Sequence, residues 1–161
     1  MKFEVDVSGE DILNKDYKIC VANEDSIIKG FKLNDELVSV LSSRFGQGKY
    51  KYKKSQKGKA TFKVRIYCVI IHYLLKAISL ENLSLFLCRD FNGREKEIRE
   101  TLISLQSKIG ADNKIREINF GKLSNDSNAH KYSYLMRKDV KNKMNTYVKI
   151  SIDDIEGYLR K

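Results

Sequence analysis

Proline is absent from the 161 residues, and cysteine occurs only three times. Without proline, no slow isomerisation of an X-Pro bond delays folding, and no proline-rich linker divides the chain. Cys20, Cys68 and Cys88 are odd in number, lie far apart and form no CxxC or Cys/His cluster. This spacing argues against a disulfide framework and a structural zinc site. All three lie in apolar runs, so we expect buried, reduced thiols of a cytosolic protein.

Long apolar segments are also lacking. The longest, from Ile66 to Leu75, contains His72 and is too short to cross a bilayer. The first eleven residues lack the apolar stretch of a signal peptide. No GxxxxGKS/T or GxSxG motif occurs, which argues against a P-loop and an α/β-hydrolase nucleophile elbow. We therefore expect a cytoplasmic protein without a membrane partner.

The composition is that of a folded, basic protein. Hydrophobic residues make up 42% and charged residues 32%, which disfavours both a disordered chain and a membrane protein. The mass of 18.7 kDa suits one domain spanning 1–161. Lys and Arg number 31 against 21 Asp and Glu, which gives a net charge of +10. Such a surplus indicates a polyanionic partner, with nucleic acid, DNA or RNA, as the first candidate.

Hydropathy patterns predict an alternation of strands and helices. Residues 3–7 alternate strictly between apolar and acidic side chains, which is typical of a half-buried strand. We expect further strands at 17–22, 26–33, 83–88 and 114–120. We expect helices from 34 or 35 to 43, at 61–79, at 94–109 with Gly110 as C-cap, at 129–141, and appended at about 151–161. The first three strands, joined by short turns, suggest an antiparallel meander.

This order, with an Asp on the first strand and another at the end of the fourth, resembles the ribonuclease H-like superfamily. The segment Val5-Asp6-Val7-Ser8-Gly9 is similar to the start of that family, and Leu85 to Asp90 to its fourth strand. The resemblance implies an α/β fold. Its mixed sheet has three antiparallel strands followed by alternating helix and strand, with the first strand central, the fourth parallel to it and helices on the faces.

The resemblance also implies a divalent-metal nuclease site. Asp6 and Asp90 would be catalytic and would hold Mg²⁺ or Mn²⁺, because hard cations prefer oxygen ligands. Asp126, as a metal ligand, or His130 would complete the site from the last helix, although many family members carry an Asp where His130 lies. A further acidic ligand would come from Glu10, Glu36 or Glu95.

Each candidate also has an ordinary structural interpretation. Asp6 can be a solvated strand residue, and Asp90 can cap the following helix. Asp126 can stabilise a turn, and His130 can be a surface histidine.

A basic segment is the strongest single signal in the chain. Residues 44–65 contain nine cations and no acid, with three glycines and two tyrosines among them. We expect an exposed loop or β-ribbon, a flexible insertion at about 44–63, whose cations bind phosphates while Tyr50, Tyr52 and Phe62 stack on unpaired bases. A disordered loop that merely aids solubility is the alternative. The predicted nucleic-acid-binding residues are Arg44, Lys49, Tyr50, Lys51, Tyr52, Lys53, Lys54, Lys57, Lys59, Lys63 and Arg65.

Three functions remain compatible with the sequence. The first is a metal-dependent nuclease, a hydrolase acting on phosphodiester bonds of DNA or RNA. The second is a non-catalytic nucleic-acid-binding protein that uses residues 44–65, and the third is an interaction subunit whose basic surface meets an acidic protein. In the second case, binding should survive Asp6→Asn and weaken steeply with salt, whereas the third predicts no nucleic-acid affinity at physiological salt. The oligomeric state does not follow from the sequence.

Overall fold

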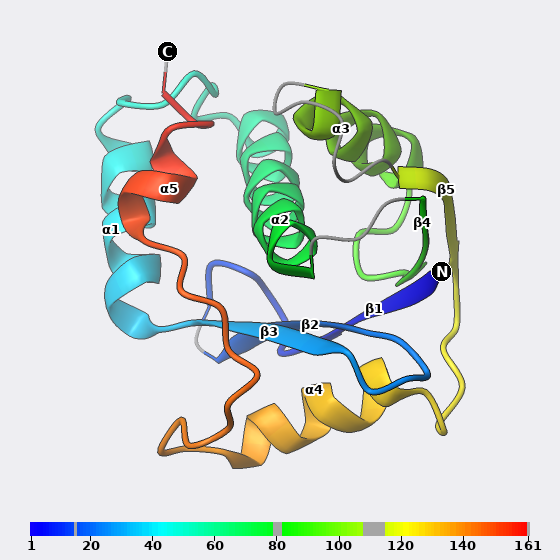
Figure 1. Cartoon of the computed structure of the whole chain (residues 1–161). Helices are drawn as coiled ribbons and strands as arrows, with labels where there is room; N and C mark the ends of the chain where they lie inside the picture. The colour runs from blue at the N-terminus through cyan, green and yellow to red at the C-terminus, as the bar shows by residue number, and fades with distance from the viewer. Residues whose placement is uncertain (15, 79–81, 108–114, 161) are drawn as a thin grey trace.

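The protein is an α/β structure in which helices flank a five-stranded mixed sheet (Figure 1). The computed structural model describes residues 1–14, 16–78, 82–107 and 115–160. The strands are β1 (Lys2–Ser8), β2 (Tyr17–Ala22), β3 (Ile28–Leu33), β4 (Leu83–Cys88) and β5 (Ile115–Gly121). The helices are α1 (Asp35–Gly46), α2 (Gln56–Ile78), α3 (Glu95–Ser107), α4 (Asn128–Lys138) and α5 (Ile152–Glu156). The predicted cap at Gly110 lies outside the described residues.

The sheet has the order β3-β2-β1-β4-β5, with β1 in the middle. β1 pairs with β2, and β2 with β3, in antiparallel fashion. β4 lies parallel to β1 and to β5. The predicted α/β class, the mixed sheet and the flanking helices are therefore confirmed.

Alternation decides which face each β1 side chain takes. Phe3 and Val5 are fully buried in the main core, whereas Asp6 points to the opposite face. β2 is buried along its whole length because both faces of the sheet are covered there. Asp6 is therefore positioned by the same pattern that builds the core.

Two helical layers cover the sheet. α2 and α3 lie on one face and α4 on the other (Figure 1). A second, smaller apolar cluster beneath α4 includes Cys20, Ile28 and Met136. A Cβ at Gly30 would lie 2.8 Å from the sulfur of Met136, so glycine is what lets α4 pack this closely on the sheet. None of the helices in the described ranges is long and apolar enough to cross a membrane.

The prediction of a loop or ribbon over 44–65 is wrong for most of that segment. Arg44 belongs to α1, and α2 already begins at Gln56, so only residues 47–55, the α1–α2 connection, lie outside helices. The physical reason is aromatic packing. The ring of Phe62 is fully buried, with its centroid 4.6 Å from that of Phe45 and 5.4 Å from that of Tyr50. This packing buries one side of the lysine-rich first turns of α2 and so stabilises them as a helix.

The C-terminal part is tied to the rest at several places. α4 ends at Lys138 rather than 141, because Asp139 accepts backbone hydrogen bonds from Lys143 and Met144 and one from the Tyr147 hydroxyl. Residues 146–148 then pair with Gly30 on the outer edge of β3. α5 starts in a capping box between Ser151 and Asp154.

Candidate nucleic-acid site

Asp6 and Asp90 come from the two central parallel strands. Val5 of β1 lies opposite Leu87 of β4, so both strands end at the same edge of the sheet. Asp90 follows the last residue of β4 by two positions. Parallel neighbours place their carboxyl ends together, and ligands of open α/β sheets bind at such an edge. The name carboxylate edge is used below for Asp6 and Asp90.

Asp6 is held in place from α4. The hydroxyl of Ser133 donates a hydrogen bond to Oδ2 of Asp6 over 2.8 Å, and Nδ1 of His130 lies 3.2 Å from the same oxygen. The side chain of Asp6 is 13% exposed and that of His130 is 48% exposed. Asp6 is thus a largely buried carboxylate oriented by Ser133 and by the more exposed His130, rather than a solvated strand residue.

Asp90 is held from the other side by β2. The buried hydroxyl of Tyr17 donates a hydrogen bond to Oδ2 of Asp90. Although Asp90 is exposed as a residue, burial of its carboxyl raises the pKa from the ordinary value. The like charges of Asp6 and Asp11 also raise this pKa, while the bond from Tyr17 lowers it. The charge of Asp6 therefore acts on the Asp90 carboxyl.

Two neutral polar side chains, Cys88 and Tyr67, lie near Asp6 and Asp90. Burial raises the pKa of the Cys88 thiol, and the charges of Asp6 and Asp90 raise it further. Burial likewise raises the pKa of Tyr67 well above its ordinary value, with Cys88 and both carboxylates adding to the effect. The Tyr67 hydroxyl has no hydrogen-bond partner among the described residues. Cys88 is a thiol rather than a thiolate here, which excludes it as a ready nucleophile.

Of the other acidic candidates, Glu10 lines the cleft beside Asp90, whereas Asp126, Glu36 and Glu95 are not part of that lining. Asp126 is exposed in the turn before α4, and no hydrogen bond between described residues joins it to Asp6 or Asp90. Glu36 and Glu95 lie in the first turns of α1 and α3, and Glu10 lies in the loop after β1. Within the described ranges, no three His, Cys, Asp or Glu side chains form a group that could hold a metal ion.

A cleft of about 590 Å³ opens beside Asp90. Its charged lining residues are Glu10, Asp11, Lys59, Lys63, Asp90 and Arg94. Nζ of Lys63 lies 2.6 Å from Oδ2 of Asp11. Burial acts to raise the pKa of Asp11, but Lys63 and the backbone N–H of Leu13 bring it below its ordinary value. Cations thus stand next to the carboxylate edge, where a phosphate would need them.

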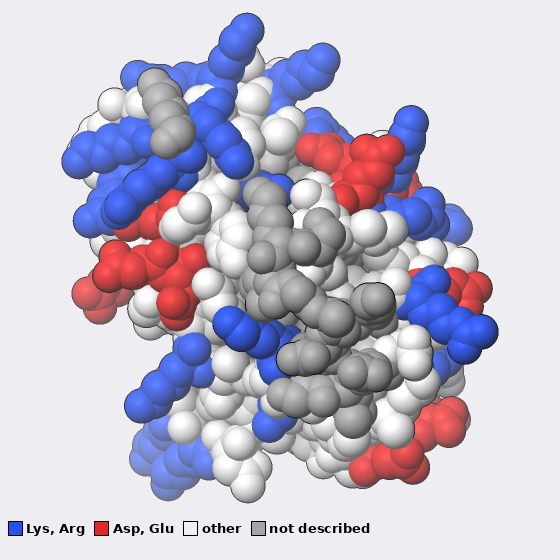
Figure 2. All heavy atoms as spheres, turned by 45° about the horizontal axis from the view of Figure 1, so that its top comes forward, with Lys and Arg blue, Asp and Glu red and all other residues white. Residues whose placement is uncertain are grey.

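Most lysines of the basic segment are at the surface. Figure 2 shows Lys and Arg side chains gathered over the end of the molecule where the α1–α2 connection and the C-terminal turn meet. The exposed members of the predicted set are Lys49, Lys51, Lys53, Lys54, Lys57 and Lys59. These six are called the lysine cluster below.

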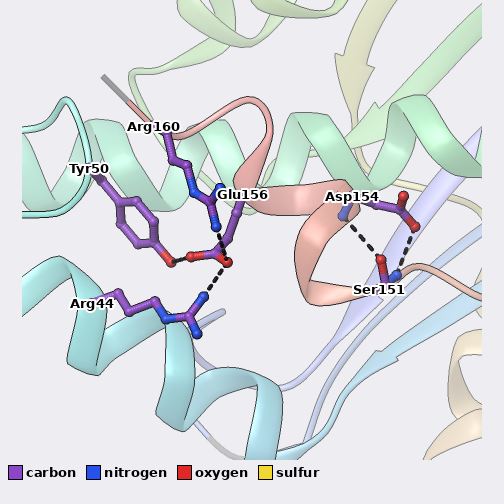
Figure 3. A network of polar contacts seen from close by, with 6 residues as sticks. All are labelled: Arg44, Tyr50, Ser151, Asp154, Glu156 and Arg160. Atoms are coloured by element: carbon purple, nitrogen blue, oxygen red, sulfur yellow. Dashed lines mark hydrogen bonds and ion pairs between the residues drawn. The ribbon is translucent and has the colours of Figure 1, made fainter.

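Two predicted contact residues are instead used inside the protein. Glu156 has a side chain only 1% exposed and accepts hydrogen bonds from Arg44, from Arg160 over 3.1 Å and from the Tyr50 hydroxyl over 2.6 Å (Figure 3). Tyr50 is 1% exposed and Phe62 is fully buried, so neither has a free ring face for a base. The prediction that Tyr50 stacks on bases is therefore wrong, because Phe62 and Glu156 already take its ring and its hydroxyl.

Two further predicted contacts are half-buried. Tyr52 and Arg65 are partly exposed, and neither the Tyr52 hydroxyl nor Nε of Arg65 has a hydrogen-bond partner in the described part of the chain. Burial raises the pKa of Tyr52 to about 12, so it is a neutral hydroxyl. Of Tyr50 and Tyr52, which were both predicted to stack on bases, Tyr52 is the one with some accessible surface.

Sequence reasoning missed the residues that hold the two carboxylates. Ser133 is three residues after His130, which places both on one face of α4, and this spacing is the signal that was available. Tyr17 carries no such signal, because its bond to Asp90 spans 73 positions. Comparison with protein-family models, with curated proteins and with solved structures found no match.

Proposed function

We propose that this protein is a ribonuclease H-like nuclease that hydrolyses phosphodiester bonds of DNA or RNA at the carboxylate edge. The observation that carries the proposal is the convergence of Asp6 and Asp90 on one sheet edge, with the charge of Asp6 contributing to the raised pKa of Asp90. The family part of the proposal is supported by a central β1, an antiparallel β1–β3 meander and a β4 parallel to β1.

Asp6 and Asp90 would hold a magnesium or manganese ion. Ser133 and Tyr17 donate to Oδ2 of Asp6 and of Asp90, respectively. Two carboxylates suit Mg²⁺, which usually keeps several water ligands and completes its shell with substrate phosphate. When bound, such an ion stabilises the charge that develops on the attacking and leaving oxygens.

The chain's own groups have separate tasks in this proposal. Ser133 and His130 orient Asp6, and Tyr17 orients Asp90. Lys59, Lys63 and Arg94 line the cleft beside Asp90 and would neutralise the phosphate that enters it. The lysine cluster extends the positive surface beyond this cleft and would hold the rest of a nucleic-acid strand.

A second candidate is nucleic-acid binding without hydrolysis. The specific observation in its favour is that the described residues contain no metal-binding group of three ligands, whereas nucleases of this type are expected to cluster carboxylates. In that case Asp6 and Asp90 would serve to dock α4 and β2, and only the cationic surface would act.

A cleavage assay separates the two candidates. Labelled single-stranded DNA, duplex DNA, RNA and an RNA–DNA hybrid would each be incubated with Mn²⁺, with Mg²⁺ or with a chelator. We expect cleavage by the wild type with metal and none by Asp6→Asn or Asp90→Asn. Asp126→Asn, in a separate arm, shows whether the third predicted carboxylate contributes.

The matched control is Asp25→Asn, which changes an exposed aspartate in the turn between β2 and β3. It should cleave like the wild type. Strand binding without cleavage in any metal, unchanged in both edge variants, would reject hydrolysis and support the second candidate.

A further inference from the structure

A large open cleft lies on the α4 side of the sheet, away from the lysine cluster. It encloses about 1200 Å³ and is bordered by the loop after β1, the β2 and β3 strands, and the C-terminal end of α4. Its cationic side chains are Lys18, Lys32, Arg137 and Lys149, and three carboxylates, Glu10, Asp16 and Asp35, also line it. None of the four cations belongs to the basic segment that the sequence singled out.

Lys18 and Lys32 are brought together by strand register. Ser8 of β1 lies opposite Lys18, and Lys18 lies opposite Lys32, so the three form one row across the sheet. Side chains two apart on a strand share a face, so this row lies on the same face as Asp6. Ser8 lies two residues after Asp6, at the C-terminal end of β1, so the row is next to Asp6 on this face.

Lys18 is a buried cation, only 5% exposed. Its ammonium donates to the backbone oxygen of Asp16 over 2.6 Å, while the Asp16 carboxylate is 4.0 Å away and 84% exposed. Burial lowers the pKa of Lys18, and the nearby Arg137 lowers it further against the effect of Asp16. An ammonium has three donors, so one backbone bond leaves capacity for a ligand.

Lys32, on the neighbouring strand β3, is a partly buried cation that also donates to a backbone oxygen. It donates to the backbone oxygen of Asp139 and to Oδ1 of Asn142, the latter over 2.7 Å. Burial lowers its pKa and the charge of Lys18 lowers it further, although Asp139 opposes both. Lys18 is therefore repelled by Lys32 and by Arg137, Asp16 and Asp139 offset this in part, and a bound anion would relieve the rest.

We propose that Lys18, Lys32 and Arg137 form a binding site for a backbone phosphate of a nucleic-acid strand, next to Asp6. A phosphate offers oxygens to several donors at once and suits a site with three cations. The open cleft and its place one register step from the carboxylate edge favour a phosphate within a strand over a small molecule. This site concerns binding, so it stands even if Asp6 and Asp90 prove not to hydrolyse anything.

Binding of a fluorescein-labelled single-stranded oligonucleotide, followed by anisotropy without divalent metal, tests this site. We expect Arg137→Gln and Lys32→Gln each to weaken binding about five-fold near 0.1 M salt, and each to lower the slope of log K against log salt by about 0.7. Lys138→Gln, the next residue on α4 and outside this cleft, is the matched control and should bind like the wild type.

Competition separates the two sources of phosphate. Inorganic phosphate and a mononucleotide are titrated against the labelled strand, and we expect neither to displace it at equal phosphate concentration. If the mononucleotide displaces the strand at equal phosphate concentration, the site binds a free nucleotide rather than a strand, and the proposal is overturned. So would wild-type affinity in both cleft variants, or an equal loss in Lys138→Gln.

Thermal unfolding of each variant checks that the fold is retained. Arg137 is an exposed residue at the end of α4, so Arg137→Gln remains informative even if Lys32→Gln loosens the contact with Asp139. If the wild type binds the strand but does not cleave it, only the proposed hydrolysis is rejected. Intact cleavage with unaltered binding in Arg137→Gln would reject only this site.

Discussion

Ser133 of α4 donates a 2.8 Å hydrogen bond to Asp6 in the middle of the sheet, across 127 positions of sequence. Ser133 is 3% exposed, and its hydroxyl also contacts the backbone oxygen of His130. This bond joins the helix to the carboxylate that the proposed chemistry depends on. It therefore couples the position of α4 to the geometry of the candidate site.

Ser133→Ala tests that coupling. Removing the hydroxyl leaves a partly buried carboxylate without one of its donors, and hydrogen bonds to charged groups are worth about 1.5–3 kcal/mol. We expect the free energy of unfolding in urea to fall by about 1–2 kcal/mol. Ser42→Ala, at an exposed position of α1, should leave it unchanged, and equal losses in both variants would contradict a specific role of Ser133.

Asp90→Asn is expected to stabilise the protein at neutral pH. A carboxyl whose pKa is raised in the folded state favours folding below its ordinary value of 3.8, and this contribution is lost as the pH rises through the folded pKa. The charged form is therefore unfavourable at neutral pH, while asparagine keeps an oxygen for Tyr17. The gain should be at most about 1 kcal/mol, because Asp90 is exposed.

Thermal unfolding across the pH range measures this difference between Asp90→Asn and the wild type. The two melting temperatures should converge below the ordinary carboxyl pKa of 3.8. A variant that is less stable at neutral pH would show that the Asp90 charge is a structural requirement instead.

His72 should make the protein lose stability in mild acid. It is 4% exposed, neither ring nitrogen has a partner among the described residues, and burial with the nearby charge of Lys76 lowers its pKa from 6.5 to about 4. The unfolded chain takes up a proton below 6.5, whereas the folded chain does so only near 4. The free energy of unfolding should therefore fall by about 1–3 kcal/mol between these values from this group.

His72→Phe isolates this contribution, because phenylalanine keeps an aromatic ring beside Tyr73 and Tyr158. The variant should show a flatter dependence of unfolding free energy on pH between 6.5 and 4. His130→Gln removes the other histidine and should retain the His72 component of the slope. If His72→Phe keeps the full wild-type slope, that assignment is wrong.

Glu156→Gln should weaken the anchor of the C-terminal helix. The buried carboxylate joins Arg44, Arg160 and Tyr50, whereas a neutral amide loses the attraction to both guanidinium groups. Arg44 and Arg160 are 36% and 60% exposed, so the loss should be about 2 kcal/mol rather than the larger cost of a fully buried pair. Urea unfolding with Glu36→Gln, an exposed glutamate of α1, provides the comparison, and equal small effects would refute the anchor.

Much of the fold follows from local patterning. The alternation of residues 3–7 predicted both the β1 strand and the face that Asp6 takes. Strand β4 and the helix after it were predicted from an apolar run followed by an amphipathic one. The carboxylate edge then follows because parallel neighbours end together.

Contacts between distant segments could not be predicted. The lysines at the start of α2 indicated a loop, because the packing of Phe62 on Phe45 and Tyr50 depends on how α1 and α2 fold together. Arg44 and Tyr50 looked available for nucleic acid because their partner, Glu156, is more than a hundred positions away. The row of Lys18 and Lys32 was hidden for the same reason, since it depends on sheet register.

The contact of Glu156 with Arg44 and Tyr50 also bears on synthesis. A ribosome delivers the α1–α2 connection long before it delivers residue 156, so Tyr50 and the guanidinium of Arg44 must wait for their carboxylate. Until residue 156 has been made, the α1–α2 connection lacks the carboxylate that joins it to α5.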